Sequence, residues 1–336
     1  MSLLPIAYVL PELVLENDTL AALYPGWTAE KIFEKTGIRS RHVSAPGETA
    51  LDLAERAARK LFETAKIEAK GIDFILFCTQ SPDYQLPTSA CILQHRLGVP
   101  ISAGALDFNL GCSGYIYGLV LAKGLIVGGM AQRVLLLTAE TYTKHIHPMD
   151  KSVRTIFGDG ASATLVDATF AERIGSFVFG TDGSGAPHLM IPCGGAREAV
   201  TEETKTEVAD HSGNIRTRNH LFMDGMEIFN FTLGIVPQML TDVLEKNRLT
   251  REDVGLYVFH QANRFMLETL RKANRLPREK FYVNMEDTGN TVSSSIPIAL
   301  VRAEAEGRLT AGTNTLLMGF GVGLSWGATF LKGKKG

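Results

Sequence analysis

Cys112 combines a reactive side chain with a local sequence that suits nucleophilic chemistry. In the run LDFNLGCSGYIYGL, a short strand-like segment ends at Gly111, and an apolar helical pattern begins just after Cys112. This arrangement predicts that Cys112 lies at a helix N-terminus, where unpaired N–H groups and the helix dipole favour the thiolate, the reactive form of cysteine. The alternative is a buried cysteine in a tight, glycine-rich turn. The segment alone leaves both interpretations open.

Two polar residues in the second half of the chain are candidates to act with this thiol. His260 ends the apolar run LYVFHQ, and residues at strand ends in open α/β sheets tend to face the ligand crevice. Asn290 follows Gly289 in the run GNTVSSSIPIAL, where a turn precedes a helical pattern and the amide can donate a hydrogen bond into a pocket. The structural alternatives are a histidine bonded to a backbone carbonyl and a simple N-cap cluster.

Other motifs carry less chemical information. The glycines of GFGVGLSWGA (319–328) permit close backbone approach, so N–H groups there can bind an oxyanion, although a turn between two buried strands is equally compatible. His145 and His147 form a lone H-x-H pair, which is too nonspecific to predict a metal site. The run FGDGASATLV (157–166) lacks both the phosphate-loop and the dinucleotide-binding spacings, so we assign it to structure.

Hydrophobic patterning predicts alternating strands and helices. Helices are predicted over 48–67, 226–247 and 264–275, and short apolar runs predict buried strands over 74–79, 134–140, 163–167, 256–261, 281–284, 315–320 and 324–331. This alternation favours parallel sheets covered by helices. The two halves repeat the order of helix, acidic turn and buried strand, which predicts a duplication into residues 1–170 and 171–336. The polar stretch 194–220 is predicted to be a long loop.

Composition narrows the classes of partner and compartment. The 336 residues are 45% hydrophobic and 21% charged with a net charge of −2, which argues against a nucleic-acid partner. The apolar stretch 115–130 is interrupted by Lys123 and is too short to cross a bilayer comfortably, and the N-terminus does not resemble a signal peptide. None of the four cysteines belongs to a C-x-x-C pair, which is typical of free thiols in a reducing compartment. We therefore expect a cytoplasmic protein with no membrane association.

Taken together, six segments resemble the β-ketoacyl-acyl carrier protein synthase III family of thiolase-like condensing enzymes. They are KTGIRSRH, GCSGYIYGL, FGDGASA, FHQAN, GNTVSSSIP and GFGVGLSWGA, and their order and spacing both agree with the family. The resemblance implies an α/β protein with the duplicated, five-layer α-β-α-β-α thiolase-like fold, usually as a homodimer. It also implies that Cys112, His260 and Asn290 form the catalytic triad, with Cys112 in the N-terminal half and the other two in the C-terminal half.

The resemblance further implies a reaction in two halves. Cys112 is first acylated by an acyl thioester, with the oxyanion held by the backbone N–H groups of Cys112 and Val322. A malonyl thioester then loses CO₂, His260 and Asn290 stabilise the enolate, and condensation gives a β-ketoacyl thioester for fatty-acid or specialised lipid or polyketide synthesis. The implied substrates are acyl-CoA or acyl-carrier protein together with malonyl-carrier protein, so acyl carrier protein is the expected partner. No metal or tightly bound cofactor is expected.

Several positions depart from the family's pattern. Lys31 and Lys35 stand where well-studied members sandwich the adenine of coenzyme A between Trp and Arg, and Lys151 aligns with a second arginine on the adenine side. Lysine stacks poorly on flat rings, so we expect weak coenzyme A binding and a protein-borne acyl donor, unless nearby Trp27 compensates. Leu86 stands where a phenylalanine often blocks the acyl pocket from across the dimer, which predicts longer or branched acyl chains.

Val322 replaces a glycine of the family in the motif GFGVG. A positive φ is costly for a β-branched residue, so the loop must differ here if that glycine needs one. Two other functions compete with condensation. One is an acyltransferase that forms an ester or amide without decarboxylation, against which Asn290 argues because it mainly serves the enolate step. The other is a non-catalytic subunit, a class that usually lacks the nucleophile.

Overall fold

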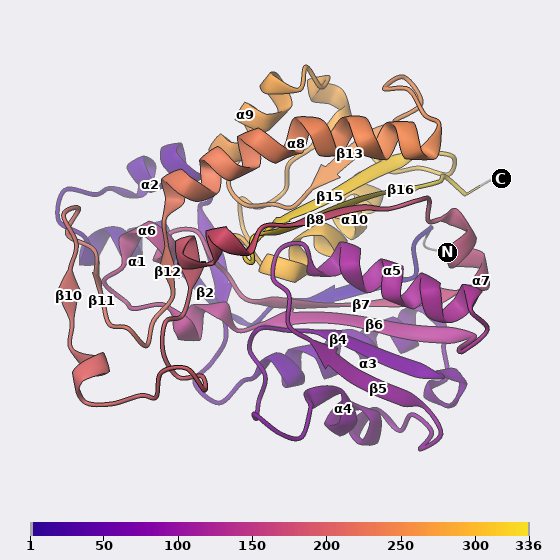
Figure 1. The fold of residues 1–336 in the computed structure, drawn as a ribbon, viewed down its shortest axis with the longest axis horizontal. Helices are drawn as coiled ribbons and strands as arrows, with labels where there is room; N and C mark the ends of the chain where they lie inside the picture. Colours follow the sequence, from indigo (N-terminus) through magenta and orange to yellow (C-terminus); the bar gives the residue numbers. More distant parts are fainter. Residues whose placement is uncertain (1–2, 335–336) are drawn as a thin grey trace.

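Two five-stranded sheets stack on either side of a central layer of helices (Figure 1). The computed structural model describes residues 3–334. The first sheet has the order β1 (Ile6–Val9), β7 (Gly160–Asp167), β6 (Arg133–Glu140), β4 (Phe74–Cys78) and β5 (Gly104–Phe108). The second has the order β8 (Val178–Thr181), β16 (Ser325–Leu331), β15 (Thr315–Gly321), β13 (Leu256–Phe259) and β14 (Phe281–Tyr282).

The two sheets have the same topology. In each, three strands run parallel (β6, β4 and β5; β15, β13 and β14), and the remaining two strands add antiparallel pairings. The expectation of parallel sheets is therefore right for three of the five strands in each sheet, from β6 to the edge strand β5 and from β15 to the edge strand β14. β7 runs antiparallel because it starts directly opposite the end of β6, where Glu140 pairs with Gly160, so the chain returns along the strand it has just left.

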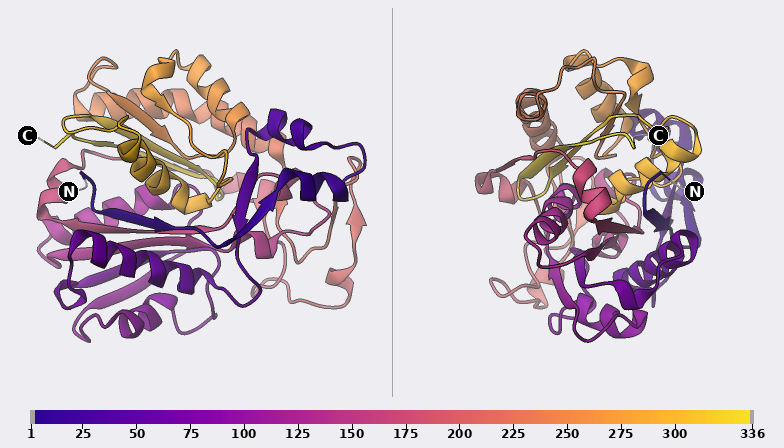
Figure 2. Two further views of the ribbon diagram at one scale, coloured as in Figure 1. Left: turned by 180° about the vertical axis from the view of Figure 1, so that it is seen from behind. Right: turned by 90° about the vertical axis from the view of Figure 1, so that its right-hand side faces the viewer.

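Helices cover both sheets and separate them, which confirms the five-layer α-β-α-β-α fold. α3 (Ala50–Ala65) and α4 (Ser89–Leu97) pack on the first sheet, α5 (Gly114–Val127) and α10 (Ser295–Ala305) lie between the sheets, and α8 (Gly225–Asn247) and α9 (Arg264–Ala273) cover the second sheet. The views from behind and from the side show the same stacking (Figure 2). The division predicted at residue 170 falls in α7 (Ala168–Arg173), which follows the last strand of the first sheet and precedes the first strand of the second.

The position of α5 in the central layer explains why the apolar stretch 115–130 has no polar face. Tyr115 of α5 and Ile296 of α10 are fully buried in one cluster with Leu136 of the first sheet and Leu317 of the second. Each buried side chain of this size contributes about 1.5–3 kcal/mol relative to exposure. A helix between two sheets is apolar nearly all round. None of the helices within residues 3–334 combines the length and the apolar character needed to cross a membrane.

A cap of short elements covers one end of the molecule, on the left in Figure 1. Its N-terminal part contains β2 (Leu13–Glu16), α1 (Asn17–Leu23), α2 (Ala29–Thr36) and β3 (Ser40–Val43), and the rest contains η2 (Tyr142–His145), α6 (Lys151–Arg154), η3 (Gly183–His188), β9 (Leu189–Met190) and β12 (Phe222–Met223). The predicted loop 194–220 also carries η4 (Glu203–Lys205) and a short hairpin of β10 (Val208–Ala209) and β11 (Ile215–Arg216). Single turns η1 (Ala69–Gly71), η5 (Arg278–Lys280) and η6 (Val292–Ser294) complete the chain.

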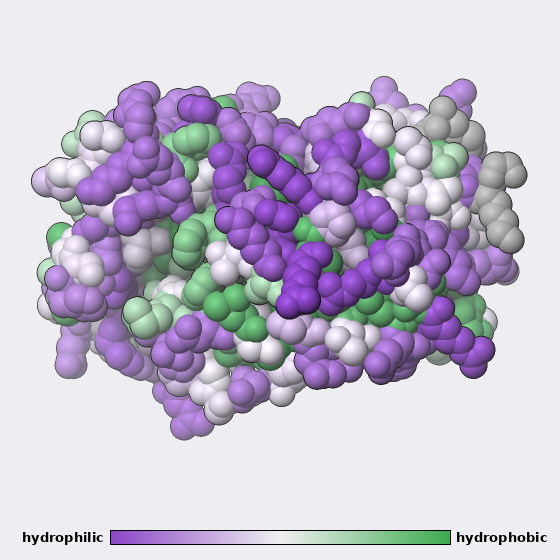
Figure 3. Space-filling view, turned by 90° about the horizontal axis from the view of Figure 1, so that it is seen from above, coloured by the Kyte–Doolittle hydropathy of each residue, from purple (hydrophilic) through white to green (hydrophobic). Residues whose placement is uncertain are grey.

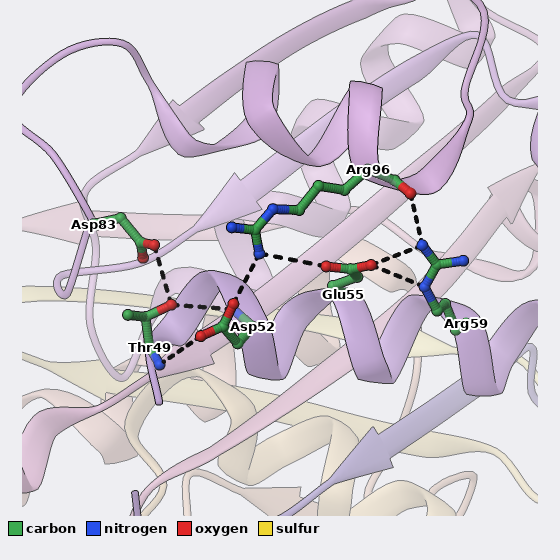
Figure 4. A network of polar contacts seen from close by, with 6 residues as sticks. All are labelled: Thr49, Asp52, Glu55, Arg59, Asp83 and Arg96. Atoms are coloured by element: carbon green, nitrogen blue, oxygen red, sulfur yellow. Dashed lines mark hydrogen bonds and ion pairs between the residues drawn. The ribbon is translucent and has the colours of Figure 1, made fainter. Parts of the chain in front are cut away.

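The loop that follows β4 is fastened to the start of α3 by polar contacts (Figure 4). Thr49 and Asp52 form a capping box at this helix start, and the Thr49 hydroxyl also donates to Asp83 in the loop (3.1 Å). Arg96 at the end of α4 reaches Asp52 (2.8 Å). These contacts fix the base of the loop that carries Leu86.

Candidate active site

Cys112, His260 and Asn290 line one cavity of about 160 Å³. Its wall is mostly apolar and is formed by Ile156, Phe157, Leu189, Met223, Ile228, Ala262, Met266 and Phe320 together with Ser152, Gly225, Thr232, Asn263 and Gly321. The three side chains lie up to 178 residues apart in the sequence, and the fold brings them together because each follows a strand that ends at this side of its sheet. An apolar cavity with a few convergent polar groups is the usual form of a substrate site.

The environment of Cys112 differs from the expectation of a stabilised thiolate. α5 begins at Gly114 with Ser113 as its N-cap, so Cys112 lies one residue before the cap. The thiol is buried, and burial is the main cause that raises the pKa of Cys112 to about 12, with a further contribution from the Glu140 carboxyl group, which repels a thiolate when it is ionised. Burial at this position therefore favours the neutral thiol over the thiolate.

Glu140 is a buried carboxyl group near the nucleophile that the sequence analysis missed. It ends β6, accepts hydrogen bonds from the Gln80 N–H (3.0 and 3.1 Å) and the Ser81 hydroxyl (3.0 Å), and is fully buried. Burial raises the pKa of Glu140 to about 8 despite these donors. A glutamate at the end of the apolar run VLLLTAE was the available signal, because charged residues are rarely buried without a specific environment.

Gly321 allows the end of β15 to lie directly against the nucleophile. A Cβ atom at this position would come within 3.0 Å of Cys112 Sγ and 2.8 Å of Cys112 Cβ, closer than real Cβ contacts permit. Val322 has no positive φ, and the next residue, Gly323, takes the unusual backbone angle instead (φ 139°). The predicted backbone conflict at Val322 therefore does not arise.

Two serine hydroxyls connect the nucleophile turn to the Val322 loop. Ser325 Oγ donates to the Val322 carbonyl (2.8 Å) and lies 2.7 Å from Ser113 Oγ. Since the single hydrogen of Ser325 is used on Val322, Ser113 is the donor in the second contact. Both serines are buried, so the backbone on the two sides of Cys112 is held in one fixed arrangement.

His260 is a neutral imidazole in this site. It follows β13, is only 2% exposed, and its Nδ1 lies 2.7 Å from Ser295 Oγ. Burial lowers the pKa of His260 to about 3, and the nearby Val292 backbone opposes this effect only in part. The ring packs edge-on against Phe320 (centroids 5.9 Å apart).

Asn290 is oriented entirely by backbone contacts. Its Oδ1 accepts the Val292 N–H (2.9 Å), which assigns the amide oxygen and leaves the NH₂ group as the donor beside the cavity. Its own N–H donates to Ile156 O (2.9 Å), and Gly158 N–H donates to Asn290 O (3.0 Å). The run FGDGASA thus has a structural function, as predicted, and that function includes positioning Asn290. Val292 adopts φ 53°, a costly angle for a β-branched residue.

The three predicted donor-binding lysines lie in the cap and are not part of the cavity wall. Lys31 Nζ and Lys35 Nζ lie 5.3 Å and 5.7 Å from the centroid of the Trp27 ring, so the two cations flank an aromatic surface. Lys151 Nζ donates to Ser212 O (2.6 Å) and so connects α6 to the 194–220 segment.

Leu86, the predicted acyl-pocket residue, does not line the Cys112 cavity of its own chain. Its side chain is 83% exposed. The position is compatible with contact to a second copy of the chain, and the role of Leu86 in an acyl pocket stays a prediction.

An apolar surface lies next to the cavity on the face formed by α8 and α9. Met226 and Phe265 are 72% and 62% exposed, and they are sequence neighbours of Gly225 and Met266 in the cavity wall. Phe265 stacks on Phe229 (centroids 5.5 Å apart). Figure 3 looks onto this side and shows hydrophobic surface between hydrophilic side chains. These residues were not predicted from the sequence.

Comparisons with known proteins agree with the geometry. The family model described as 3-oxoacyl-[acyl-carrier-protein] synthase III matches residues 106–183, and the model of its C-terminal part matches residues 244–332. Beta-ketoacyl-[acyl-carrier-protein] synthase III of Caldanaerobacter subterraneus is 36% identical over 328 residues, which cover 97% of this chain and 96% of the relative.

Solved structures extend the similarity to three dimensions. A 3-oxoacyl-(acyl-carrier-protein) synthase III crystal structure is 56% identical with a TM-score of 0.96, covering 98% of this chain and 99% of the other. The priming β-ketosynthase of the R1128 polyketide pathway is 29% identical with a TM-score of 0.85, covering 100% of this chain and 97% of the other. The same fold therefore occurs in relatives named for acyl-carrier-protein synthases and for polyketide priming.

Proposed function

Because the chain belongs to the β-ketoacyl-acyl carrier protein synthase III family, we propose that Cys112, His260 and Asn290 carry out a decarboxylative condensation. The enzyme joins an acyl thioester to a malonyl thioester and releases a β-ketoacyl thioester and CO₂. The observation that carries this proposal is that the thiol, the imidazole and the amide line one cavity of about 160 Å³. The nucleophile and the two hydrogen-bond donors thereby meet at one reacting centre.

The first half-reaction is a thioester exchange. Cys112 Sγ attacks the acyl carbonyl, the bond to the departing thiol breaks, and the proton of Cys112 ends on that thiol, so the step needs no net proton. A resting thiol is sufficient because deprotonation accompanies the attack. The backbone N–H groups of Cys112 and Val322 are the proposed donors to the oxyanion, and losing one such donor typically costs about 2.7–4 kcal/mol in barrier height.

The second half-reaction forms the carbon–carbon bond. The malonyl carboxylate leaves as CO₂, and the electron pair it leaves behind forms an enolate whose oxygen accepts hydrogen bonds from His260 and Asn290. The enolate carbon attacks the acyl group on Cys112, the carbon–sulfur bond breaks, and Cys112 recovers a proton from solvent. The neutral state of His260 suits a donor to a developing oxyanion, because burial holds its pKa at about 3 and a single N–H remains.

We propose acyl carrier protein as the partner for the malonyl group and as the preferred carrier of the acyl donor. Lys31, Lys35 and Lys151 supply positive charge in the cap, which suits phosphopantetheine and an acidic carrier. The stacking geometry expected for coenzyme A adenine is replaced by a Trp27 ring flanked by two lysines. Steady-state rates with matched acyl-CoA and acyl-carrier-protein donors test this preference, and a clear preference for acyl-CoA would contradict it.

We also propose that the enzyme is a homodimer. β5 is an edge strand of the first sheet, and Leu106 on it is 39% exposed, while Leu86 in the preceding loop is 83% exposed. An apolar edge strand invites pairing with another chain. Light scattering coupled to size-exclusion chromatography should give twice the 36.6 kDa chain mass, and a monomer would exclude a role for Leu86 in a second copy.

The function is tested with purified enzyme, malonyl-carrier protein labelled in its free carboxyl group, and a panel of acyl donors. We expect labelled CO₂ and a β-ketoacyl product that carries the donor's chain. Acylation of Cys112 followed by transfer to a hydroxyl or amine without CO₂ release would instead support an ester- or amide-forming acyltransferase. Absence of both CO₂ and product with every donor would refute the condensation.

A further inference from the structure

The hydroxyl of Ser295 lies against the back of the His260 ring. Ser295 is the first residue of α10, is buried, and places its Oγ 2.7 Å from His260 Nδ1. His260 in turn lines the Cys112 cavity. A hydroxyl in this position contacts no reacting atom, and it acts on the reaction only through the imidazole.

The hydrogen bonds around Ser295 determine whether its hydroxyl or the His260 Nδ1 atom is the donor. Ser295 Oγ already accepts the Gln261 N–H (3.3 Å). Within residues 3–334, His260 Nδ1 is the acceptor in range of the single Ser295 hydroxyl hydrogen. If Nδ1 donated instead, that hydrogen would be buried without an acceptor, an arrangement that folded proteins avoid. Nδ1 therefore accepts.

A neutral imidazole carries a single N–H hydrogen, so if one ring nitrogen accepts a hydrogen bond, the other nitrogen carries the hydrogen. Burial keeps His260 neutral, with its pKa lowered to about 3. With Nδ1 as an acceptor, the hydrogen is on Nε2. Asn290 is arranged in the same way, because its Oδ1 is occupied by the Val292 N–H and its NH₂ group is left as the donor.

We propose that Ser295 is a positioning residue that selects the Nε2-protonated tautomer of His260, so that the imidazole enters the condensation step as a hydrogen-bond donor. This inference rests on the proposed function for its catalytic consequence. The tautomer itself is a property of the resting protein and does not depend on which reaction the enzyme catalyses.

The tautomer of His260 should affect the condensation half-reaction and not the acylation of Cys112. Acylation of Cys112 does not need a donor from His260, whereas the enolate does. Without Ser295 the imidazole can adopt either tautomer, and the fraction with hydrogen on Nδ1 presents a lone pair to a negatively charged oxygen. Loss of the partner that orients a metal-binding histidine typically costs about 10–100-fold, and we expect a loss of the same order for a histidine that must donate to the enolate.

The experiment compares Ser295→Ala with Ser294→Ala in the intact enzyme. Ser294 is an equally buried neighbour, but its hydroxyl bonds to Thr138 rather than to His260. Long-range ¹⁵N–¹H spectra of ¹⁵N-histidine protein report the tautomer, and the His260 signals are assigned as those missing from His260→Ala. Single-turnover acylation and CO₂ release are measured separately on the same samples.

We expect the wild type and Ser294→Ala to show an unprotonated Nδ1 at His260. Ser295→Ala should show a mixed or Nδ1-protonated ring, about 10–100-fold slower CO₂ release and near-normal acylation. Ser295→Thr, which keeps a hydroxyl, should restore the wild-type spectrum and rate ratio. A merely structural role would instead slow both steps together and leave the tautomer unchanged.

Two results would overturn the inference. One is an Nδ1-protonated His260 in the wild type, which stays testable even if Ser295→Ala does not fold. The other is an unchanged tautomer in folded Ser295→Ala. If the wild type releases no CO₂ with any donor, the proposed function fails, but the spectra still decide the tautomer, so the two failures are distinguishable.

Discussion

Cys112 and Asn290 occupy equivalent places in the two halves of the molecule. Cys112 lies between β5 and the central helix α5, and Asn290 lies between β14 and the central helix α10. β5 and β14 also hold corresponding places at the edges of their sheets. One fold position thus carries the nucleophile in the first half and a hydrogen-bond donor in the second.

The two places are held by different means. Around Cys112 the constraint is close packing, since Gly321 leaves no room for a Cβ atom beside the thiol. Around Asn290 and His260 the constraint is hydrogen bonding, from Val292 N–H and the Ser295 hydroxyl. The surroundings of Cys112, the nucleophile side, should therefore be sensitive to added volume. The surroundings of Asn290 and His260, the donor side, should be sensitive to lost hydrogen bonds.

The largest effect should follow removal of the thiol. Cys112→Ala leaves no nucleophile to accept the acyl group, so acyl-enzyme formation should be abolished. Intact-protein mass spectrometry after incubation with an acyl donor measures this directly. Cys91→Ala, which removes an exposed cysteine on α4, is the control and should acylate normally. An adduct of unchanged yield on Cys112→Ala would refute the assignment of the nucleophile.

Loss of the imidazole should separate the two half-reactions. His260→Ala removes one of two donors to the enolate, so CO₂ release should fall by about 10²–10³-fold while acylation of Cys112 continues. Because burial lowers the pKa of His260 to about 3, the ring stays neutral above about pH 4, and its ionisation should not appear in the condensation pH profile between pH 5 and 8. A variant unable to accept the acyl group would contradict this division of labour.

Added volume tests the nucleophile side. In Gly321→Ala the new Cβ atom would fall 3.0 Å from Cys112 Sγ, so the thiol or β15 must shift. A misplacement of about 1 Å can cost about 10²-fold in rate, and acylation should fall by that order. Gly124→Ala in α5 is the matched control, because no atom lies within 4 Å of its added Cβ. Equal acylation rates in both variants would show that packing against Gly321 does not position the thiol.

A smaller effect should follow loss of one hydroxyl on the same side. Ser325→Ala removes the hydrogen bonds that connect the Val322 carbonyl to Ser113. One hydrogen bond contributes about 0.5–1.5 kcal/mol, so acylation should slow by about 2–10-fold through a loosened oxyanion site. Single-turnover acylation measures it. A selective loss of condensation, with normal acylation, would assign Ser325 to the donor side instead.

The sequence predicted the fold and the three central residues because their signals are local and of different kinds. Buried strands such as 134–140 begin with several consecutive apolar residues, and the order of Cys112, His260 and Asn290 along the chain carries the family resemblance. The charge state of Cys112 was not predictable, because burial depends on which surfaces meet. Glu140 was missed for the same reason.

Hydrogen-bond partners could not be predicted from the sequence either. Ser293, Ser294 and Ser295 are identical in type and adjacent, yet only the third contacts His260. Which serine faces the imidazole depends on the turn η6 and on the positive φ of Val292, the first residue of that turn. A run of serines at a helix start predicts capping, and it does not reveal a partner in another strand.

Leu86 tests whether a second copy of the chain shapes the site. If Leu86 reaches the acyl pocket of a partner, Leu86→Phe adds volume there and should shift the preference of the enzyme toward short acyl chains. We expect the ratio of the kcat/KM values for short and long donors to change by about 10-fold, because one methylene group too many in an apolar pocket typically lowers kcat/KM by at least this factor. Competition between short and long donors measures the ratio. Tyr84→Phe is the control, because Tyr84 is 60% exposed in the same loop and the substitution adds no volume. An unchanged profile in a proven dimer would mean that packing within one chain, around Cys112, sets the chain length on its own.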